Sequence, residues 1–198
     1  MARGNGSASG PSAAGAPSSE PAAPPGWDEN PTAWPKRIAI AGVACVGLCV
    51  AGYLTLYQLG LFSGVWDPFF PRGSPEVLGL TEPFPDAALG VLAYGTEVIL
   101  SFIGGSDRWR TMPWTALAFG LVILGGFVVS VLLMIVQPLV AGAWCTPCLV
   151  SAVISIVIFR WGADEPLAAL QHLERVRASG GSVWRALLGM EAAEKGAD

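Results

Sequence analysis

Four apolar stretches separated by polar segments dominate the chain and predict its main elements. They cover residues 38–62, 87–103, 114–136 and 145–161. About 20 apolar residues in an α-helix are enough to cross the hydrocarbon core of a bilayer. We therefore expect an all-α integral membrane protein with a bundle of four transmembrane helices. The second stretch is short, and it carries an acid, Glu97.

The polar segments at the two ends predict two different kinds of tail. Residues 1–35 are mostly Ala, Gly, Ser and Pro, a composition that cannot build a core and predicts a disordered cytoplasmic tail. Residues 163–198 are polar, with Leu and Val at helical spacing, which is typical of amphipathic helices on a membrane surface. Between them, residues 36–162 form the predicted transmembrane redox domain. His172, in the second tail, is expected to be solvated or packed rather than a ligand.

The longest polar stretch inside the membrane domain is the loop of residues 63–86. Its five prolines break any long helix, and its aromatic residues give it an apolar side. One interpretation is that the loop folds onto the membrane face and caps the bundle. The other is a simple connector whose aromatic residues sit in the interface: Trp66, Phe69, Phe70 and Phe84.

Composition and charge support a membrane protein and predict its orientation. The chain is 53% hydrophobic and 13% charged, about half the usual charged fraction of roughly 25%. With four spans, ten of the eleven Lys and Arg residues fall on one side, and only Arg72 falls on the other. Basic residues mark the cytoplasmic side. We therefore expect a multi-pass protein of the cytoplasmic membrane, with both termini cytoplasmic. No basic stripe suggests a nucleic-acid partner.

The candidate chemistry lies in Trp144-Cys145-Thr146-Pro147-Cys148, at the head of the last span. Two thiols at a helix start can close a disulfide, and the helix N-terminus stabilises a thiolate there. The predicted orientation places this pair at the outer surface, where a disulfide can persist. Such a dithiol can pass two electrons to a lipid quinone. Cys145 and Cys148 are therefore the predicted catalytic residues. Zinc requires four ligands, and no second pair or nearby histidine exists, so no metal is expected.

Two other features leave alternatives open. Glu97 is either a functional acid, or a side chain that snorkels or pairs with Arg108 or Arg110. Cys45 and Cys49 lie four residues apart on one face of the first span. They either pack as small apolar residues or form a second redox pair. The same span contains small positions that would let a neighbouring helix approach: Gly42, Gly47 and Gly52.

The cysteine motif at the start of a fourth span resembles the vitamin K epoxide reductase family, including its bacterial homologues. Two further runs carry the resemblance, residues 73–78 and residues 84–90 with Tyr94, so that it covers about residues 38–161. The resemblance implies a quinone, menaquinone or ubiquinone, held near Cys148. It also implies that Cys145 exchanges with a second cysteine pair, which takes electrons from a thioredoxin-like partner outside the cytoplasm.

The chain departs from that family pattern at the relay. Ser74 stands where one loop cysteine is expected, and no cysteine occurs near Trp66 or Asp67, the other expected place. Ala152 replaces the aromatic residue expected one turn after the second cysteine. Either the Cys145–Cys148 pair exchanges directly with a substrate thiol, or the protein is a non-catalytic, structural or quinone-binding membrane subunit.

Asp86 stands immediately before the second span, at the mouth of the expected quinone pocket. A protonated carboxyl group there would donate a hydrogen bond to a quinone carbonyl. The same side chain could instead cap the N-terminus of the second span, which is the interpretation that we favour.

Overall fold

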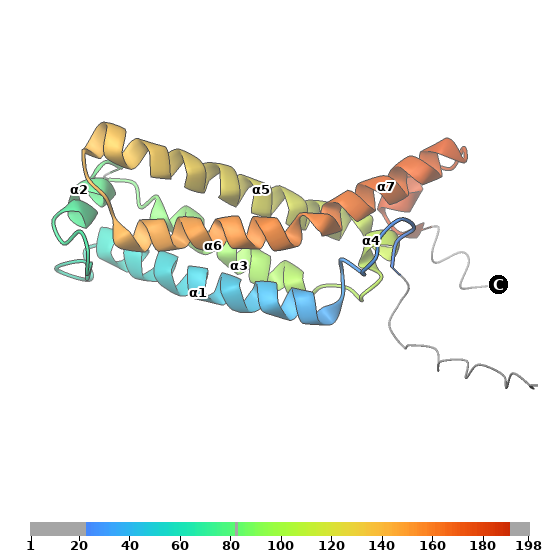
Figure 1. The fold of residues 1–198 in the computed structure, drawn as a ribbon, viewed down its shortest axis with the longest axis horizontal. Helices are drawn as coiled ribbons and strands as arrows, with labels where there is room; N and C mark the ends of the chain where they lie inside the picture. The colour runs from blue at the N-terminus through green and yellow to red at the C-terminus, as the bar shows by residue number, and fades with distance from the viewer. Residues whose placement is uncertain (1–22, 82, 191–198) are drawn as a thin grey trace, which may run out of the picture.

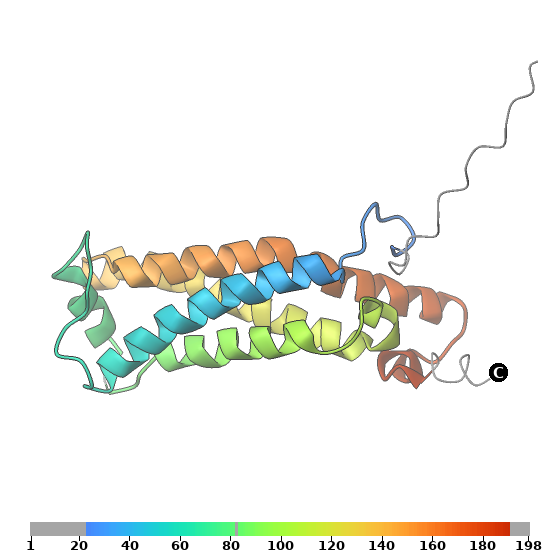
Figure 2. The same cartoon turned by 90° about the horizontal axis from the view of Figure 1, so that it is seen from below.

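The computed structural model describes residues 23–81 and 83–190, and all regular structure in these ranges is helical. Four helices run side by side in both views (Figure 1 and Figure 2). They are α1 (Trp34–Gln58), α3 (Ala87–Phe102), α5 (Pro113–Val136) and α6 (Thr146–Gly162). Within the described residues, three helical stretches are long and apolar enough to cross a membrane: Trp34–Gln58, Pro113–Ala141 and Thr146–Ala178. α3 is apolar but shorter.

The shorter elements gather at the two ends of this bundle (Figure 1). At one end, α2 (Gly73–Gly79) lies beside the start of α6, and the π-helical turn η1 (Gln137–Ala141) extends α5. At the other end lie α4 (Arg108–Thr111), α7 (Asp164–Ala178) and α8 (Val183–Leu187). We call these the α2 end and the α4 end.

α1 begins and ends about four residues before the predicted span. Pro35 occupies its first turn, where a missing N–H costs no hydrogen bond. The helix ends at Gln58 because Gly60 adopts a left-handed conformation, with φ of 74°. The sequence prediction ran on to Phe62 because apolar residues continue past this turn.

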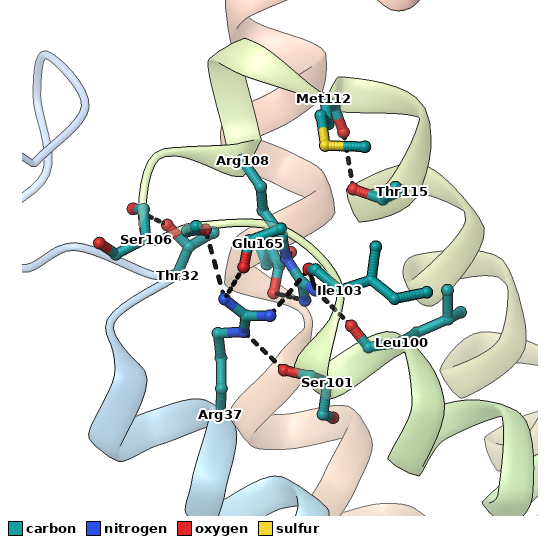
Figure 3. Close-up of polar contacts among 12 residues, drawn as sticks. Thr32, Arg37, Leu100, Ser101, Ile103, Ser106, Arg108, Met112, Thr115 and Glu165 are labelled. Carbon is teal, nitrogen blue, oxygen red and sulfur yellow. Dashed lines mark hydrogen bonds and ion pairs between the residues drawn. The ribbon is translucent and has the colours of Figure 1, made fainter.

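Arg37 lies inside α1 and is buried at the α4 end together with Arg108 and Glu165 (Figure 3). Arg37 donates from Nε to the Ser101 carbonyl at 2.8 Å and from Nη2 to the Ile103 carbonyl at 2.8 Å. Arg108 also donates to the Ile103 carbonyl, at 2.8 Å, and pairs with the Glu165 carboxylate through two nitrogens. These contacts satisfy carbonyls that the last turn of α3 leaves unpaired.

The bundle core contains both large apolar residues and one close helix contact. Phe119, Ile123 and Ile158 are almost fully buried. A Cβ atom added to Gly47 would lie 2.6 Å from the ring of Tyr94, so α1 and α3 approach closely there. Of the small positions predicted on this helix, only Gly47 makes such a contact, because nothing lies within 4 Å of a Cβ added at the other two, Gly42 and Gly52.

The described part of the N-terminal segment differs from the predicted disorder. Thr32 is fully buried, Asn30 donates to the Ser106 carbonyl at 2.8 Å, and the Trp27 indole donates to Gln171 at 2.8 Å. These contacts tie residues 27–32 to α7 and to the loop before α4, whereas the prediction extended disorder to residue 35. Residues 1–22 of that predicted tail lie outside the described residues.

The C-terminal segment forms α7 and α8 within the predicted amphipathic tail. His172 packs edge-to-face against Trp109, with ring centroids 5.7 Å apart. It is therefore a packing residue in this structure, one of the two roles expected for it. Residues 191–198 of the tail are not described.

Candidate active site

Cys145 and Cys148 form a disulfide at the α2 end, with their Cα atoms 5.2 Å apart. Cys145 is the N-cap residue of α6, and its sulfur accepts a hydrogen bond from the Cys148 N–H at 3.3 Å. Pro147 fits the first helical turn, as its missing N–H requires. Cys145 is fully buried, whereas Cys148 is partly exposed. The structure therefore brings the two predicted sulfurs together and gives them different surroundings.

The backbone before the disulfide is held by Gln137, a residue that sequence reasoning did not select. Gln137 begins η1 and is buried. Its side-chain oxygen accepts a hydrogen bond from the Cys145 N–H at 3.0 Å. The π-helical turn η1 thus places the polar side chain of Gln137, at the end of α5, against the start of α6.

Asp67 holds the loop of residues 63–86 against the start of α6. Its carboxylate accepts hydrogen bonds from Ser74 Oγ at 2.5 Å, from the Thr146 N–H at 2.8 Å and from Thr146 Oγ1 at 2.5 Å. It also accepts from two N–H groups of its own loop, those of Phe69 and Phe70. We call Asp67, Ser74 and Thr146 the Asp67 clasp. Burial opposes ionisation of Asp67, but the hydrogen bonds from Ser74 and Thr146 outweigh it and hold the pKa of Asp67 well below its usual range.

The Asp67 clasp occupies the region where the family resemblance places the missing loop cysteines. The loop covers the start of α6 through polar contacts, supported by a close backbone approach at Gly73. A Cβ atom there would lie 2.3 Å from the Trp144 carbonyl oxygen, so only glycine fits. The aromatic residues of the loop are mostly exposed, about three-quarters so for Trp66, Phe69 and Phe84.

A cavity of about 560 Å³ opens beside Cys148. Its volume lies within the range typical of small-molecule sites, about 300–1,000 Å³. Side chains of α1, α3, α5 and α6 form a mostly apolar wall. The polar residues in that wall are Asp86, Tyr94, Thr96, Glu97, Ser130, Ser151 and Ser155.

Asp86 lines this cavity but does not cap α3, so the favoured sequence interpretation is wrong. It stands at the N-cap position, yet its side chain accepts no hydrogen bond from the first turn of the helix. Gln58 takes over that role, because its side-chain oxygen accepts from the Ala87 N–H at 3.1 Å. The amide nitrogen of Gln58 donates to Asp86 Oδ1 at 2.5 Å.

A hydroxyl network lines the cavity between α3 and α6. The Tyr94 hydroxyl lies 2.7 Å from the Ser151 carbonyl oxygen, 2.9 Å from Ser151 Oγ and 2.8 Å from Ser155 Oγ. Ser151 follows Cys148 by about one helical turn, so the network lies close to Cys148 along α6 and lines the same cavity. Sequence reasoning noted Tyr94 only through the family resemblance, and it overlooked both serines.

Glu97 is buried in the wall of the cavity and does not pair with either predicted arginine. Arg108 binds Glu165, and Arg110 lies 3.5 Å from Asp107. Glu97 is 2% exposed, and its Oε2 atom has no hydrogen-bond partner among the described residues. The snorkelling and pairing alternatives for Glu97 are therefore wrong.

Cys45 and Cys49 remain unbonded thiols on the exposed surface of α1. They do not form a second disulfide, and they do not lie in the core of the bundle. Neither cysteine lines the cavity beside Cys148.

A comparison with known protein families gives a match that spans these residues. The model of the family described as "Vitamin K epoxide reductase family" matches residues 38–162, well over half of the chain. The match includes the cysteine pair, the Asp67 clasp and the cavity-lining residues. No curated protein matches the chain.

Proposed function

Because the chain belongs to the vitamin K epoxide reductase family, whose members are quinone-linked membrane thiol–disulfide oxidoreductases, we propose the following activity. The protein passes electrons between the Cys145–Cys148 dithiol and a lipid quinone, menaquinone or ubiquinone, in support of disulfide formation outside the cytoplasm. The observation that carries this proposal is the largely apolar cavity with Cys148 in its wall.

The first half-reaction transfers electrons from a substrate to the protein. A substrate thiolate attacks the Cys145–Cys148 disulfide, forms a mixed disulfide with one cysteine and releases the other as a thiolate. A second substrate thiol then displaces the bound cysteine, leaving an oxidised substrate and a reduced cysteine pair. Cys145 is the residue that exchanges with the substrate, because Cys148 faces the cavity.

The second half-reaction restores the disulfide. Two electrons pass from the dithiol to the quinone through Cys148, and the Cys145–Cys148 bond forms again. The two thiols release two protons, and the quinone takes up two to become a quinol, so the step balances without another reactant.

The Asp67 clasp supports direct exchange with an external thiol protein. Asp67 and Ser74 replace a cysteine relay with hydrogen bonds, which transfer no electrons. Since Cys145 is fully buried beneath this loop, a substrate thiol reaches it when the clasp opens. The partner is a thioredoxin-like or other thiol protein outside the cytoplasm.

The proposed membrane arrangement has four spans, namely the three long helical stretches and the shorter helix α3. α3 lies alongside the three longer helices in both views, and Arg37 and Arg108 satisfy the carbonyls at its end. The α4 end, which carries most of the basic residues, is cytoplasmic together with both termini. The α2 end, with the disulfide, faces outwards from the cytoplasmic membrane.

The test is quinone reduction by the reduced protein in lipid nanodiscs, followed by the absorbance of the quinol. We expect turnover by the wild type, and Cys148→Ala should abolish it because no second sulfur remains to close the disulfide. The double variant Cys45→Ala/Cys49→Ala is the matched control and should retain wild-type turnover, since those thiols lie on the exposed surface of α1. Unchanged turnover in Cys148→Ala would refute the proposal. A pair that resists strong reductant, with no turnover, would indicate a non-catalytic membrane subunit.

A further inference from the structure

Glu97 is a buried acid in the cavity wall that the proposed electron transfer does not use. It is 2% exposed, and its Oε2 atom has no hydrogen-bond partner in the described part of the chain. A polar group buried without a partner costs free energy, and more so at membrane depth. Because Glu97 lines the cavity, a ligand in that cavity can supply the missing partner.

Glu97 belongs to α3 and Cys148 belongs to α6, so the two residues line the cavity from different helices. Side chains of a helix lean towards its N-terminus, and α3 begins at the α2 end (Figure 1). The Glu97 side chain therefore reaches from its Cα atom towards the level of Cys148. Tyr94, one turn earlier on α3, is tied to Ser151 and Ser155 on α6, which fixes the two helices at this level.

The α5 wall of the cavity next to this carboxyl group carries two glycines. Gly125 and Gly126 both line the cavity, and they lack side chains where α5 faces α3. A Cβ atom added to Gly126 would lie 3.6 Å from Glu97 Oε1, in van der Waals contact. Gly126 therefore lies against the carboxyl group, whereas nothing lies within 4 Å of a Cβ atom added to Gly125, where the cavity is open. Val122 and Val129 of the same helix add apolar surface to this wall.

We propose that Glu97 is a catalytic residue that binds the quinone carbonyl farther from Cys148 and donates the proton that this oxygen takes up. The inference rests on the proposed function. A quinone ring carries carbonyls on opposite edges, and Cys148 and Glu97 lie on different walls of the same cavity. This assignment gives each edge of the ring a protein group.

The proton balance of this step closes within the site. Disulfide formation releases one proton from each thiol. One of these reaches the quinone oxygen nearer the cysteines. Glu97 protonates the other oxygen, and the proton from the second thiol restores its carboxyl group. The quinone gains two electrons and two protons, and Glu97 ends as it began.

Two substitutions at Glu97 separate proton transfer from binding and from folding. Glu97→Gln keeps a hydrogen-bond donor of the same shape but cannot give up a proton. We expect its kcat for quinone reduction in nanodiscs to fall about 100-fold, as for loss of a general acid, with KM within about threefold of wild type because the donor is retained. Glu97→Leu removes the donor as well, so its KM should also rise, by about tenfold, as expected for one lost hydrogen bond.

The thermal unfolding midpoint of the same variants tests a merely structural role. Glu97→Leu should unfold at or above the wild-type midpoint, because leucine removes an unpartnered buried polar group. Ser101→Ala is the matched control on the same helix. The Ser101 hydroxyl donates to the backbone carbonyl oxygen of Glu97 at 2.8 Å, and Ser101 does not line the cavity. The kcat and KM of this variant should therefore equal those of the wild type.

The outcomes distinguish this inference from the proposed function. A wild type that turns over quinone, together with a Glu97→Gln variant of equal kcat, overturns the role of Glu97 alone. A Glu97→Leu variant whose lower activity matches a lower folded fraction overturns it as well, in favour of a structural acid. A folded wild type without quinone turnover refutes the proposed function, and the role of Glu97 falls with it.

Discussion

Asp67 holds the loop of residues 63–86 to the start of α6 through hydrogen bonds. Its carboxylate accepts five hydrogen bonds, and the donors come from its own loop, from Ser74 in α2 and from Thr146 at the start of α6. A charged acceptor with several donors forms stronger hydrogen bonds than a neutral one. Because Thr146 follows the buried Cys145 directly, we expect the stability of the loop to control access to the Cys145 sulfur.

The first prediction at the residue scale concerns Asp67→Asn. Both carboxylate oxygens of Asp67 accept hydrogen bonds, and asparagine replaces one of them with an NH₂ group that cannot accept. We therefore expect the free energy of unfolding to fall by on the order of 2 kcal/mol. In the reduced protein, Cys145 should react faster with an alkylating reagent, because the loop opens more often. Glu76→Gln, an exposed acid of α2, is the control and should change neither quantity. Unchanged alkylation in Asp67→Asn would contradict this role of the loop.

The same substitution gives a pH signature whose sign follows from the lowered pKa of Asp67. The carboxylate contributes its full stabilisation above the pKa of an unfolded aspartate, about 3.9. That contribution is lost as the pH falls from this value towards the lower pKa of the folded state. The difference in unfolding free energy between wild type and Asp67→Asn should therefore be constant from pH 5 to pH 8 and shrink below about pH 4.

The sequence predicted the cysteine pair but not its supports, for a physical reason. Cys145 and Cys148 are close in sequence, so their spacing alone determines that the sulfurs can meet. Asp67 acts on Thr146 across 79 residues, and Gln137 acts on Cys145 across eight residues through the π-helical turn η1; no local pattern encodes either contact. Asp86 was misread for the same reason, because Gln58, 28 residues earlier, binds its carboxylate and takes over its capping role.

At the scale of helices, the positions of the spans could be predicted, whereas their ends could not. Apolar length located α3, α5 and α6 to within one residue. α1 was placed about four residues too late, because a charged residue usually marks the end of a span. Arg37 violates that rule, since backbone carbonyls at the end of α3 satisfy its guanidinium group within the bundle. The pattern of hydrophobic residues cannot predict a hydrogen bond to a backbone carbonyl of another helix.

Helix contact through Gly47 yields the second prediction. A methyl group at Gly47 would lie 2.6 Å from the Tyr94 ring, so the ring must move and its hydroxyl must leave Ser151 and Ser155. We expect Gly47→Ala to lower the unfolding free energy by about 1–3 kcal/mol, the usual range for overpacking. Gly42→Ala, on the same helix with nothing within 4 Å, should be neutral or slightly stabilising. Equal unfolding midpoints for the two variants would show that α1 and α3 do not approach closely at Gly47.

At the scale of the whole molecule, different groups cover the two ends of the bundle. The α4 end is closed by buried guanidinium groups, by the Lys36–Asp164 ion pair at 2.6 Å and by α7. The α2 end is closed by the Asp67 clasp over a disulfide. Charged groups at the first end resist transfer across a bilayer, and a disulfide at the second persists only in an oxidising compartment. Both observations favour the same orientation.

The orientation is tested by labelling single introduced cysteines in intact cells. Ser63→Cys lies in the loop at the α2 end, and Ser179→Cys lies just after α7, at the other end; both positions are exposed. We expect a membrane-impermeant maleimide to label Ser63→Cys in intact cells and Ser179→Cys only after permeabilisation. The wild type is the background control, because Cys145 and Cys148 are joined and the other two thiols lie within α1. The reverse labelling pattern would place the disulfide in the reducing cytosol, where it could not pass oxidising equivalents to an external thiol.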